Sequence, residues 1–306
     1  MKKIFIMAAT AMVFASCSQT ELEENSVGQK EIKFSNLNDK VTRAANDNNA
    51  NYKVYAAWST GSNWFINDEV NGTTNVPVNG PYHWPAAGSV SFYSWAPSTV
   101  TATDVYPDLS IAYTVPANAA EDFTIAAPKT GLSSGTVDLV FSHMLAKISV
   151  TAKLDQDLLD AGYTITAPMN LIASLDVRST SGTIVPTAAT PAWTSPNTTT
   201  ASYTGAASYM IMPQSSIGCA VQITAGIQIM KNGTEIYGGD LSKYTIVSGN
   251  VTGDQFEMGK HYMLNLTISD ASTGGGGENI FNIITFTSTV ADWDTPAGTD
   301  TPLVQP

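Results

Sequence analysis

From residue 52 onward, the apolar residues of this chain recur with a period of two. Such alternation puts apolar side chains on one face of a β-strand and is typical of half-buried strands. Thr, Ser, Gly, Asn and Pro fill the stretches between, as expected of turns and loops. Only residues 156–161 indicate a short helix. The clearest alternating segments are residues 52–58, 89–95, 137–141, 146–154, 221–229, 262–268 and 280–290.

The chain length, 306 residues, is sufficient for two domains of ordinary size. Together with the period of two, this length predicts an all-β protein built from two β-sandwich domains in tandem. We expect a signal peptide at residues 1–16 and a tether at residues 17–45. The N-terminal domain would then comprise residues 46–155, and the C-terminal domain and tail residues 156–306.

Two local signals predict turns between strands. Apolar residues are odd-numbered in residues 137–141 and even-numbered in residues 146–154, so the chain needs a bulge or tight turn between them. His143 lies at this break, and we expect its ring to bond a backbone group freed there. Asn232-Gly233, between two alternating segments, predicts a hairpin with a type I′ turn.

The N-terminus carries an export signal. Lys2 and Lys3 precede a twelve-residue apolar run, residues 4–15, and small residues lead to Cys17. The run is too short to span a bilayer, which favours a cleaved secretory signal. Cys17 at the junction resembles a bacterial lipobox, in which the thiol is acylated and becomes the new N-terminus. The alternative is an ordinary signal peptide with a coincidental cysteine.

Composition excludes several classes of partner. The formal net charge is −12 and only 13% of residues are charged, whereas nucleic acids and anionic lipids require a cationic face. Cys219 is the only cysteine besides Cys17, so no intrachain disulfide survives lipidation. We expect Cys219 to lie in the core as a small apolar residue.

No constellation of residues predicts an enzyme, a cofactor or a metal site. His83, His143 and His261 are scattered, without acidic or cysteine partners at metal-ligand spacing, so we expect structural or surface roles for them. Adjacent carboxylates such as Glu121 and Asp122 face opposite ways on a strand. Calcium binding by the acidic residues near the C-terminus is less favoured than a solvated tail, because the glycine and ligand spacing of a calcium loop are missing.

Tryptophan is concentrated in the predicted N-terminal domain. Trp58, Trp64, Trp84 and Trp95 offer flat aromatic faces of the kind that bind sugars. The alternative, which we favour, is that they fill the sandwich core and its rims, where tryptophan buries a large area.

Five segments together resemble motifs of the fimbrillin-like family, the type V pilins of certain Gram-negative bacteria. Each motif alone is weak, but they occur in the family's order, behind a lipobox, over about 280 residues. They are a Phe-x-His-x-x-Ala-Lys strand in residues 140–150, an apolar-Pro-Gln strand in residues 209–214, a Gly-x-x-Tyr strand from Gly259, a closing strand with Trp293, and a weaker match in residues 92–97.

The resemblance implies two transthyretin-like, Greek-key β-sandwich domains, related to the immunoglobulin-like architecture. It also implies export as a palmitoylated lipoprotein to the outer membrane, followed by assembly into a surface fimbria. In the family, an arginine-specific protease removes the N-terminal strand, and a strand from a neighbouring pilin subunit takes its place.

The tether contains residues suited to that mechanism. Residues 31–37 are its only strand-like segment, and Ile32, Phe34 and Leu37 could bury their side chains in a groove. Arg43 follows in an Asn-rich stretch suited to proteolysis, which predicts processing between Arg43 and Ala44. A domain that loses this strand exposes apolar surface and an unpaired edge, and it would accept a strand from another chain. The alternative for Arg43 is a solvated charge without a role.

The C-terminal tail departs from a stalk pilin. Residues 294–306 contain Pro296, Pro302 and Pro306, and proline cannot donate to a strand ladder. The tail favours a tip or accessory subunit, or makes residues 280–293 the donor. Two functions therefore remain open: a fimbrial subunit that polymerises and adheres, and a monomeric surface lipoprotein that binds glycans of a host or bacterial surface.

Overall fold

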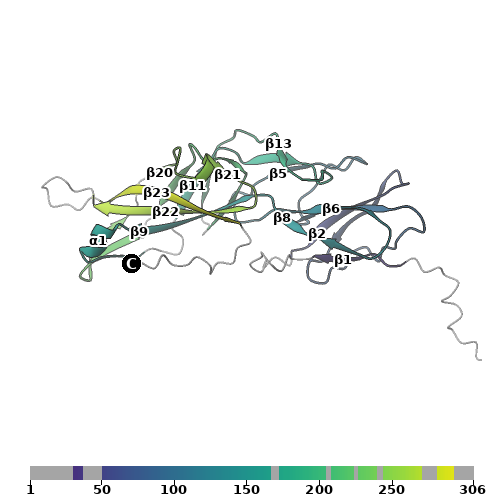
Figure 1. Ribbon diagram of the computed structural model, residues 1–306, viewed down its shortest axis with the longest axis horizontal. Helices are drawn as coiled ribbons and strands as arrows, with labels where there is room; N and C mark the ends of the chain where they lie inside the picture. The colour runs from purple at the N-terminus through teal and green to yellow at the C-terminus, as the bar shows by residue number, and fades with distance from the viewer. Residues whose placement is uncertain are drawn as a thin grey trace, which may run out of the picture.

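The computed structural model describes residues 30–36, 50–166, 172–204, 208–223, 227–239, 244–270 and 281–292. These residues form an elongated molecule that consists almost entirely of β-strands (Figure 1), which confirms the predicted all-β class. The helical elements of the described residues are α1 (Gln156–Asp160), as predicted from residues 156–161, and the 3₁₀ turn η2 (Thr252–Asp254).

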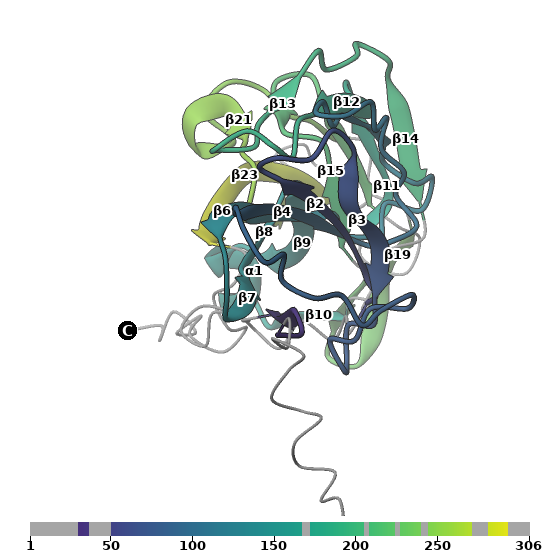
Figure 2. The same ribbon diagram turned by 90° about the vertical axis from the view of Figure 1, so that its right-hand side faces the viewer.

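Two sheets form one end of the molecule (Figure 1). A five-stranded antiparallel sheet has the order β3-β2-β4-β6-β8, formed by Trp64–Val70, Tyr52–Trp58, Val90–Ala96, Thr124–Leu132 and Phe141–His143. Beside it, β1 (Lys33–Asn36) pairs in parallel with β7 (Thr136–Leu139). The end-on view shows β1, in purple, near β7 and apart from β2, β3 and β4 (Figure 2).

The remaining strands form five further sheets. The longest strands lie in the order β15-β9-β22-β23, formed by Tyr209–Ile211, Ala146–Leu154, Lys260–Asp270 and Phe281–Asp292. A second four-stranded sheet has the order β14-β11-β17-β20, formed by Ala201–Thr204, Ile172–Val177, Ala220–Ile223 and Tyr244–Thr245.

The other three sheets are smaller. The sheet β10-β18-β19 is formed by Tyr163–Thr166, Ile227–Lys231 and Thr234–Gly239. The sheet β13-β12-β5 is formed by Trp193–Thr194, Ser181–Ile184 and Ile111–Thr114. The pair β16-β21 is formed by Gln214–Ser215 and Gln255–Phe256.

Strand β9 comes from the first half of the chain but pairs with strands from the second half. We expect residues 146–154 in the N-terminal domain, but β9 pairs antiparallel with β15 and parallel with β22, both from the second half of the chain. Parallel neighbours need a long crossover, and the strands between β9 and β22 supply it. The two-domain division itself stays a prediction.

The predicted turns are found where the sequence indicates them. Residues 137–141 divide into β7 and β8, and β9 begins at Ala146, so the alternation of buried residues changes parity as expected. Asn232 and Gly233 have φ angles of 50° and 77° and connect β18 to β19, which is the type I′ hairpin. One strand expectation is wrong: residues 221–229 are not one strand, because β17 ends at Ile223 and β18 begins at Ile227 in another sheet.

His143 has a side-chain partner that was not among the expectations. Its Nδ1 lies 2.6 Å from Oδ2 of Asp122, so the carboxylate accepts a hydrogen bond from the ring. A bond from the ring to a freed backbone group stays a prediction. The backbone N–H of the next residue, Met144, donates to the carbonyl of Phe123 at 2.8 Å. The backbone N–H of Met144 is thus paired within this turn.

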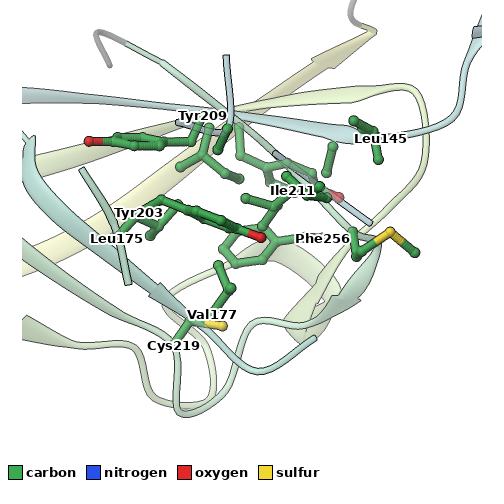
Figure 3. Packing of buried hydrophobic residues seen from close by; sticks show 14 of the residues in the cluster. Leu145, Leu175, Val177, Tyr203, Tyr209, Ile211, Cys219 and Phe256 are labelled. Atoms are coloured by element: carbon green, nitrogen blue, oxygen red, sulfur yellow. The ribbon is translucent and has the colours of Figure 1, made fainter. Parts of the chain in front are cut away.

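The buried hydrophobic residues form two clusters. The smaller cluster lies between β1, β7 and one face of the five-stranded sheet. The larger cluster extends from the other face of that sheet into the second half of the chain. Figure 3 shows part of the larger cluster, where Cys219 lies against Val177 below the ring of Tyr203. Cys219 is thus a core residue, as predicted.

We predict that the Cys219 thiol does not react while the protein is folded. Burial raises its pKa to about 11, so the thiolate that alkylating reagents attack is scarce at pH 8. Treatment with iodoacetamide at pH 8, followed by mass spectrometry of the peptide that contains Cys219, should find modification only after addition of guanidinium chloride. Equal modification of folded and unfolded protein would contradict the buried position.

A strand-binding slot in the N-terminal core

Residues 30–36 are paired with two other segments, each through different residues of their own. On one side, residues 33–36 lie in parallel register with residues 136–139 of β7. On the other side, the Ile32 N–H donates to the carbonyl of Tyr82 at 2.7 Å, and the Trp84 N–H donates to the carbonyl of Lys30 at 2.9 Å. We call this position of residues 31–36, between β7 and residues 82–84, the β1 slot. Its occupant comes from the predicted tether, and it pairs with residues 82–84 through residues 30–32 and with β7 through residues 33–36.

Two side chains anchor β1 in the core. Ile32 is 1% exposed and Phe34 is 5% exposed, and both belong to the smaller hydrophobic cluster. The Phe34 ring meets Phe92 edge to face, with 5.9 Å between the ring centroids, and Phe92 meets Trp84 in the same way at 5.7 Å. Burial of each side chain contributes about 1.5–3 kcal/mol. Leu37, the third residue that we predict for the removable strand, lies outside the described residues.

Polar contacts hold the last two residues of β1. The Ser35 hydroxyl donates to Oδ1 of Asp138 on β7 at 2.7 Å. The Asn36 side chain donates to the carbonyl of Gly72 at 3.0 Å and accepts from Nδ2 of Asn75 at 3.2 Å. The side chain of Lys33, in contrast, is exposed. The slot therefore surrounds the five positions of its occupant differently. Ile32 and Phe34 are buried among apolar side chains, and Lys33 between them is open to solvent. Ser35 and Asn36 make polar contacts.

A loop pairs with residues 30–32, directly before β1, and is anchored by one buried carboxylate. Residues 71–84 follow β3, and we call them the strap. Asp68 on β3 is 2% exposed and accepts hydrogen bonds from the Glu69 N–H, the Asn79 N–H, Nδ2 of Asn79 and the Tyr82 hydroxyl at 2.7–3.1 Å. Burial and the negative charge of Asp68 raise the pKa of Tyr82. These bonds satisfy the charge and position the Tyr82 carbonyl that bonds β1.

Asp68 was not among the predicted site residues, although the sequence contains a signal for it. Ile66, Asp68 and Val70 share one face of β3, and the two apolar residues mark that face as buried. A carboxylate on a buried face requires several donors, which the strap supplies. Of the predicted site residues, the structure brings Ile32 and Phe34 together, whereas Cys17, Arg43 and Ala44 lie outside the described residues.

The tryptophans largely fill the interior. Trp84 and Trp95 are buried, in the smaller and the larger cluster respectively. Trp58 and Trp64 are partly buried and pack against these clusters. Trp64 meets the rings of Tyr55, Tyr93 and Tyr106 edge to face, so its surroundings are other aromatic rings of this chain.

Two of the resembling motifs have clear structural roles. The Gln214 side chain accepts from the backbone N–H groups of Arg178 and Ser179 at 2.8 and 2.9 Å, and thus joins β16 to the end of β11. Gly259 has a φ of +72°, and its N–H donates to the carbonyl of Leu145 at the start of β9. Both contacts connect segments that are distant in sequence.

Neither a metal centre nor a membrane helix is found in the part of the chain that the structure describes. No three His, Cys, Asp or Glu side chains there are grouped so that they could hold a metal ion. No helix within those residues is sufficiently long and apolar to cross a bilayer.

Comparison with known proteins identifies the family. A family model described as fimbrillin-like matches residues 29–293, which is well over half of the chain. The chain therefore belongs to the fimbrillin-like family, whose members are fimbrial and adhesion proteins of the cell surface. The matched region includes the whole β1 slot and its occupant. No curated protein matched the chain.

Solved structures share the fold at low sequence identity. A candidate cell adhesion protein from Bacteroides uniformis ATCC 8492 is 20% identical, with a TM-score of 0.55 over 88% of this chain and 99% of that chain. A fimbrial protein from Bacteroides vulgatus ATCC 8482 is 13% identical, with a TM-score of 0.54 over 86% of this chain and 99% of that chain. This chain thus spans nearly the full length of both.

Truncation of Phe34 should destabilise the protein strongly, whereas truncation of its neighbour should not. Phe34→Ala removes a ring from the smaller cluster and should lower the free energy of unfolding by about 3–5 kcal/mol. Lys33→Ala, at an exposed position of the same strand, should change it by less than about 0.5 kcal/mol. Denaturant unfolding followed by tryptophan fluorescence measures both. Equal effects would contradict the assignment of Phe34 to the core.

Substitution of Asp68 should loosen the strap. Asp68→Asn keeps the shape but turns an NH₂ group toward donors, which should lower the free energy of local opening by about 1–3 kcal/mol. Hydrogen exchange at the amides of Ile32 and Asn79 should accelerate accordingly. The matched control is Glu69→Gln, because the side chain of Glu69 accepts from Asn51 and Ser98 instead of the strap. Unchanged exchange in Asp68→Asn would show that the carboxylate does not anchor the strap.

Proposed function

We propose that this protein is a structural subunit of a type V fimbria, exported as a lipoprotein and assembled by strand exchange after proteolysis. The observation that carries the proposal is the insertion of residues 30–36 into the N-terminal core, where residues 30–32 pair with residues 82–84 and residues 33–36 pair with β7. A segment that belongs to the predicted tether completes the core of the domain that follows it. Membership of the fimbrillin-like family supports the same function.

Removal of β1 would leave a site that requires a replacement strand. The backbone edges of β7 and of residues 82–84 would both lose their partners, and unpaired edges are templates for another strand. Val137, Leu139 and Trp84, which are now buried, would lose the cover of Ile32 and Phe34. Binding of an extended segment from another subunit restores both the ladder and the core, which is β-augmentation.

Arg43 is the proposed cleavage site. The chain contains only two arginines, Arg43 and Arg178. The Arg178 guanidinium donates to the carbonyl of Ile217 at 3.3 Å within the second half of the chain, away from β1 in sequence. Cleavage between Arg43 and Ala44 by an arginine-specific protease would detach residues 17–43, including β1, from the domain.

In this proposal the lipid on Cys17 serves transport. It would hold the subunit at the outer membrane until Arg43 is cut, after which the subunit joins other pilin subunits in a surface fimbria. An uncut subunit would keep the lipid as its anchor. The positions open to the protein are stalk, tip and accessory subunit, and its adhesion target would be a host or bacterial surface glycan or protein.

Glycan binding through the tryptophans is the weaker alternative. Trp84 and Trp95 are committed to the core, so the aromatic faces that remain for a sugar belong to partly buried residues such as Trp58 and Trp64. A structural role in assembly is compatible with the burial of Trp84, because Trp84 belongs to the cluster that packs against β1. We therefore favour the fimbrial subunit, without a catalytic role.

Cleavage at Arg43 should produce multimers. Treatment of the membrane-bound protein with an arginine-specific protease should yield a chain that begins at Ala44 and a ladder of multimers on a gel. Arg43→Lys should retain residues 17–43 and remain monomeric, because the protease does not cut after lysine. Arg178→Lys, at the other arginine, should behave like the original protein. N-terminal sequencing and gel electrophoresis provide the measurement.

Two results would count against this function. Mature surface protein that still carries residues 18–43 would exclude Arg43 as the processing site. Absence of multimers after complete cleavage at Arg43 would exclude the polymerising role.

A further inference from the structure

We infer that residues 109–123 clamp the five-stranded sheet to the second half of the chain, and that this clamp keeps the sheet folded after β1 has left its slot. This inference rests on the strand exchange proposed above, since only a subunit that loses β1 needs a second support. It adds a device in the fold that preserves the subunit between cleavage and the arrival of a partner.

The five-stranded sheet is packed on both faces, and β1 contacts only one of them. Alternate residues of a strand face opposite ways. On β2, Val54 and Ala56 belong to the smaller cluster, which contains the apolar residues of β1. Tyr55 between them belongs to the larger cluster, where its ring stacks on Trp95 with 5.3 Å between the centroids. Loss of β1 therefore uncovers one face of the sheet and leaves the packing of the other face in place.

The clamp joins that second face to the second half of the chain through backbone hydrogen bonds. It contains β5, which pairs antiparallel with β12 over four residues in the sheet β13-β12-β5 (Figure 1). Directly after β5, the Val115 N–H donates to the carbonyl of Thr180 at 2.9 Å. Further along, the carbonyl of Ala119 accepts from the Met210 N–H at 2.6 Å. Three segments of the second half thus hold the clamp along its length.

One tryptophan of the second half connects the clamp to the end of the five-stranded sheet. The Tyr113 ring stacks on Phe123 at 4.5 Å, and both rings meet Trp193 of β13, at 6.0 and 5.8 Å between centroids. Nε1 of Trp193 donates to the carbonyl of Met144 at 2.6 Å. Met144 directly follows β8, the last strand of the sheet, and its own N–H donates to the carbonyl of Phe123. Trp193 therefore contacts both the clamp and the point where the chain leaves the sheet.

The two supports of the sheet are separate, so one can be lost without the other. The contacts of β1 lie in the smaller cluster, whereas Tyr113, Phe123 and Met144 belong to the larger cluster. Proteins open in cooperative units of different stability, and a unit held by many buried contacts opens last. We therefore expect the backbone that pairs with β1 to lose protection after trimming, while the five-stranded sheet keeps it.

Hydrogen exchange on the trimmed protein tests this expectation. The full chain with Arg178→Lys, in which Arg43 is the remaining arginine, is cut after Arg43, and the monomer free of residues 17–43 is isolated. The Trp84 amide, which donates to the carbonyl of Lys30, should exchange at least about 100-fold faster than in the uncut protein. The amides of β2 should still exchange at least about 1,000-fold more slowly than in the unfolded chain.

Two matched variants of the trimmed protein show whether the clamp supplies the support. Trp193→Phe removes the donor to Met144 and part of the ring against the clamp, so it should accelerate exchange of the β2 amides at least about tenfold. The control is Trp58→Phe. Trp58 is also partly buried and donates to a backbone carbonyl, that of Ala87 at 2.9 Å, but it packs against the smaller cluster. It should accelerate the same amides at most about threefold.

The outcomes separate this inference from the proposed function. If the β2 amides lose their protection together with the Trp84 amide, or if the two variants have equal effects, the clamp does not support the sheet and the inference is overturned. If the β2 amides stay protected and only Trp193→Phe exposes them, the clamp is supported. A protected sheet that forms no multimers after cleavage would leave the clamp standing and count against strand exchange.

Discussion

The first part of this molecule depends on the insertion of β1 between β7 and residues 82–84. Without β1, two backbone edges lose their partners and the smaller hydrophobic cluster loses Ile32 and Phe34. Hydrogen bonds and apolar burial therefore act together at one short strand, and both require that the slot be filled. Because β1 comes from the predicted tether, the stability of the domain and the fate of the tether are linked.

The strap makes that insertion specific. Asp68 collects its hydrogen bonds from β3 and from the strap, and Tyr82 connects this carboxylate to the backbone that pairs with β1. A buried carboxylate is costly unless its donors remain in place, so the network resists movement of the strap when the slot is emptied. The slot would then keep its shape for a second strand. Asp138 and Asn75 add polar contacts that an apolar groove alone lacks.

Local patterns predicted the individual elements well, and long-range pairing was beyond them. The alternation of residues 146–154 and the Asn232-Gly233 turn were sufficient to predict β9 and the β18–β19 hairpin, because both depend on neighbouring residues. Residues 221–229 kept their period although two different sheets share them, and periodicity cannot reveal to which sheet a strand belongs. The contact of His143 with Asp122, 21 residues away, likewise could not be read from neighbouring residues. Asp68 was missed because its donors lie in a loop whose path the sequence does not reveal.

By itself, the sequence determined the all-β class, the positions of most strands and turns, and the apolar face that carries Ile32 and Phe34. It also predicts the export signal with Cys17. These features depend on composition and on the order of nearby residues. Only the tertiary structure decided that β1 lies parallel to β7, about a hundred residues away, and that a strap anchored by Asp68 pairs with the residues directly before it. The physical reason is that a strand's pattern specifies which face is buried, whereas its neighbours are chosen by the packing of the whole domain.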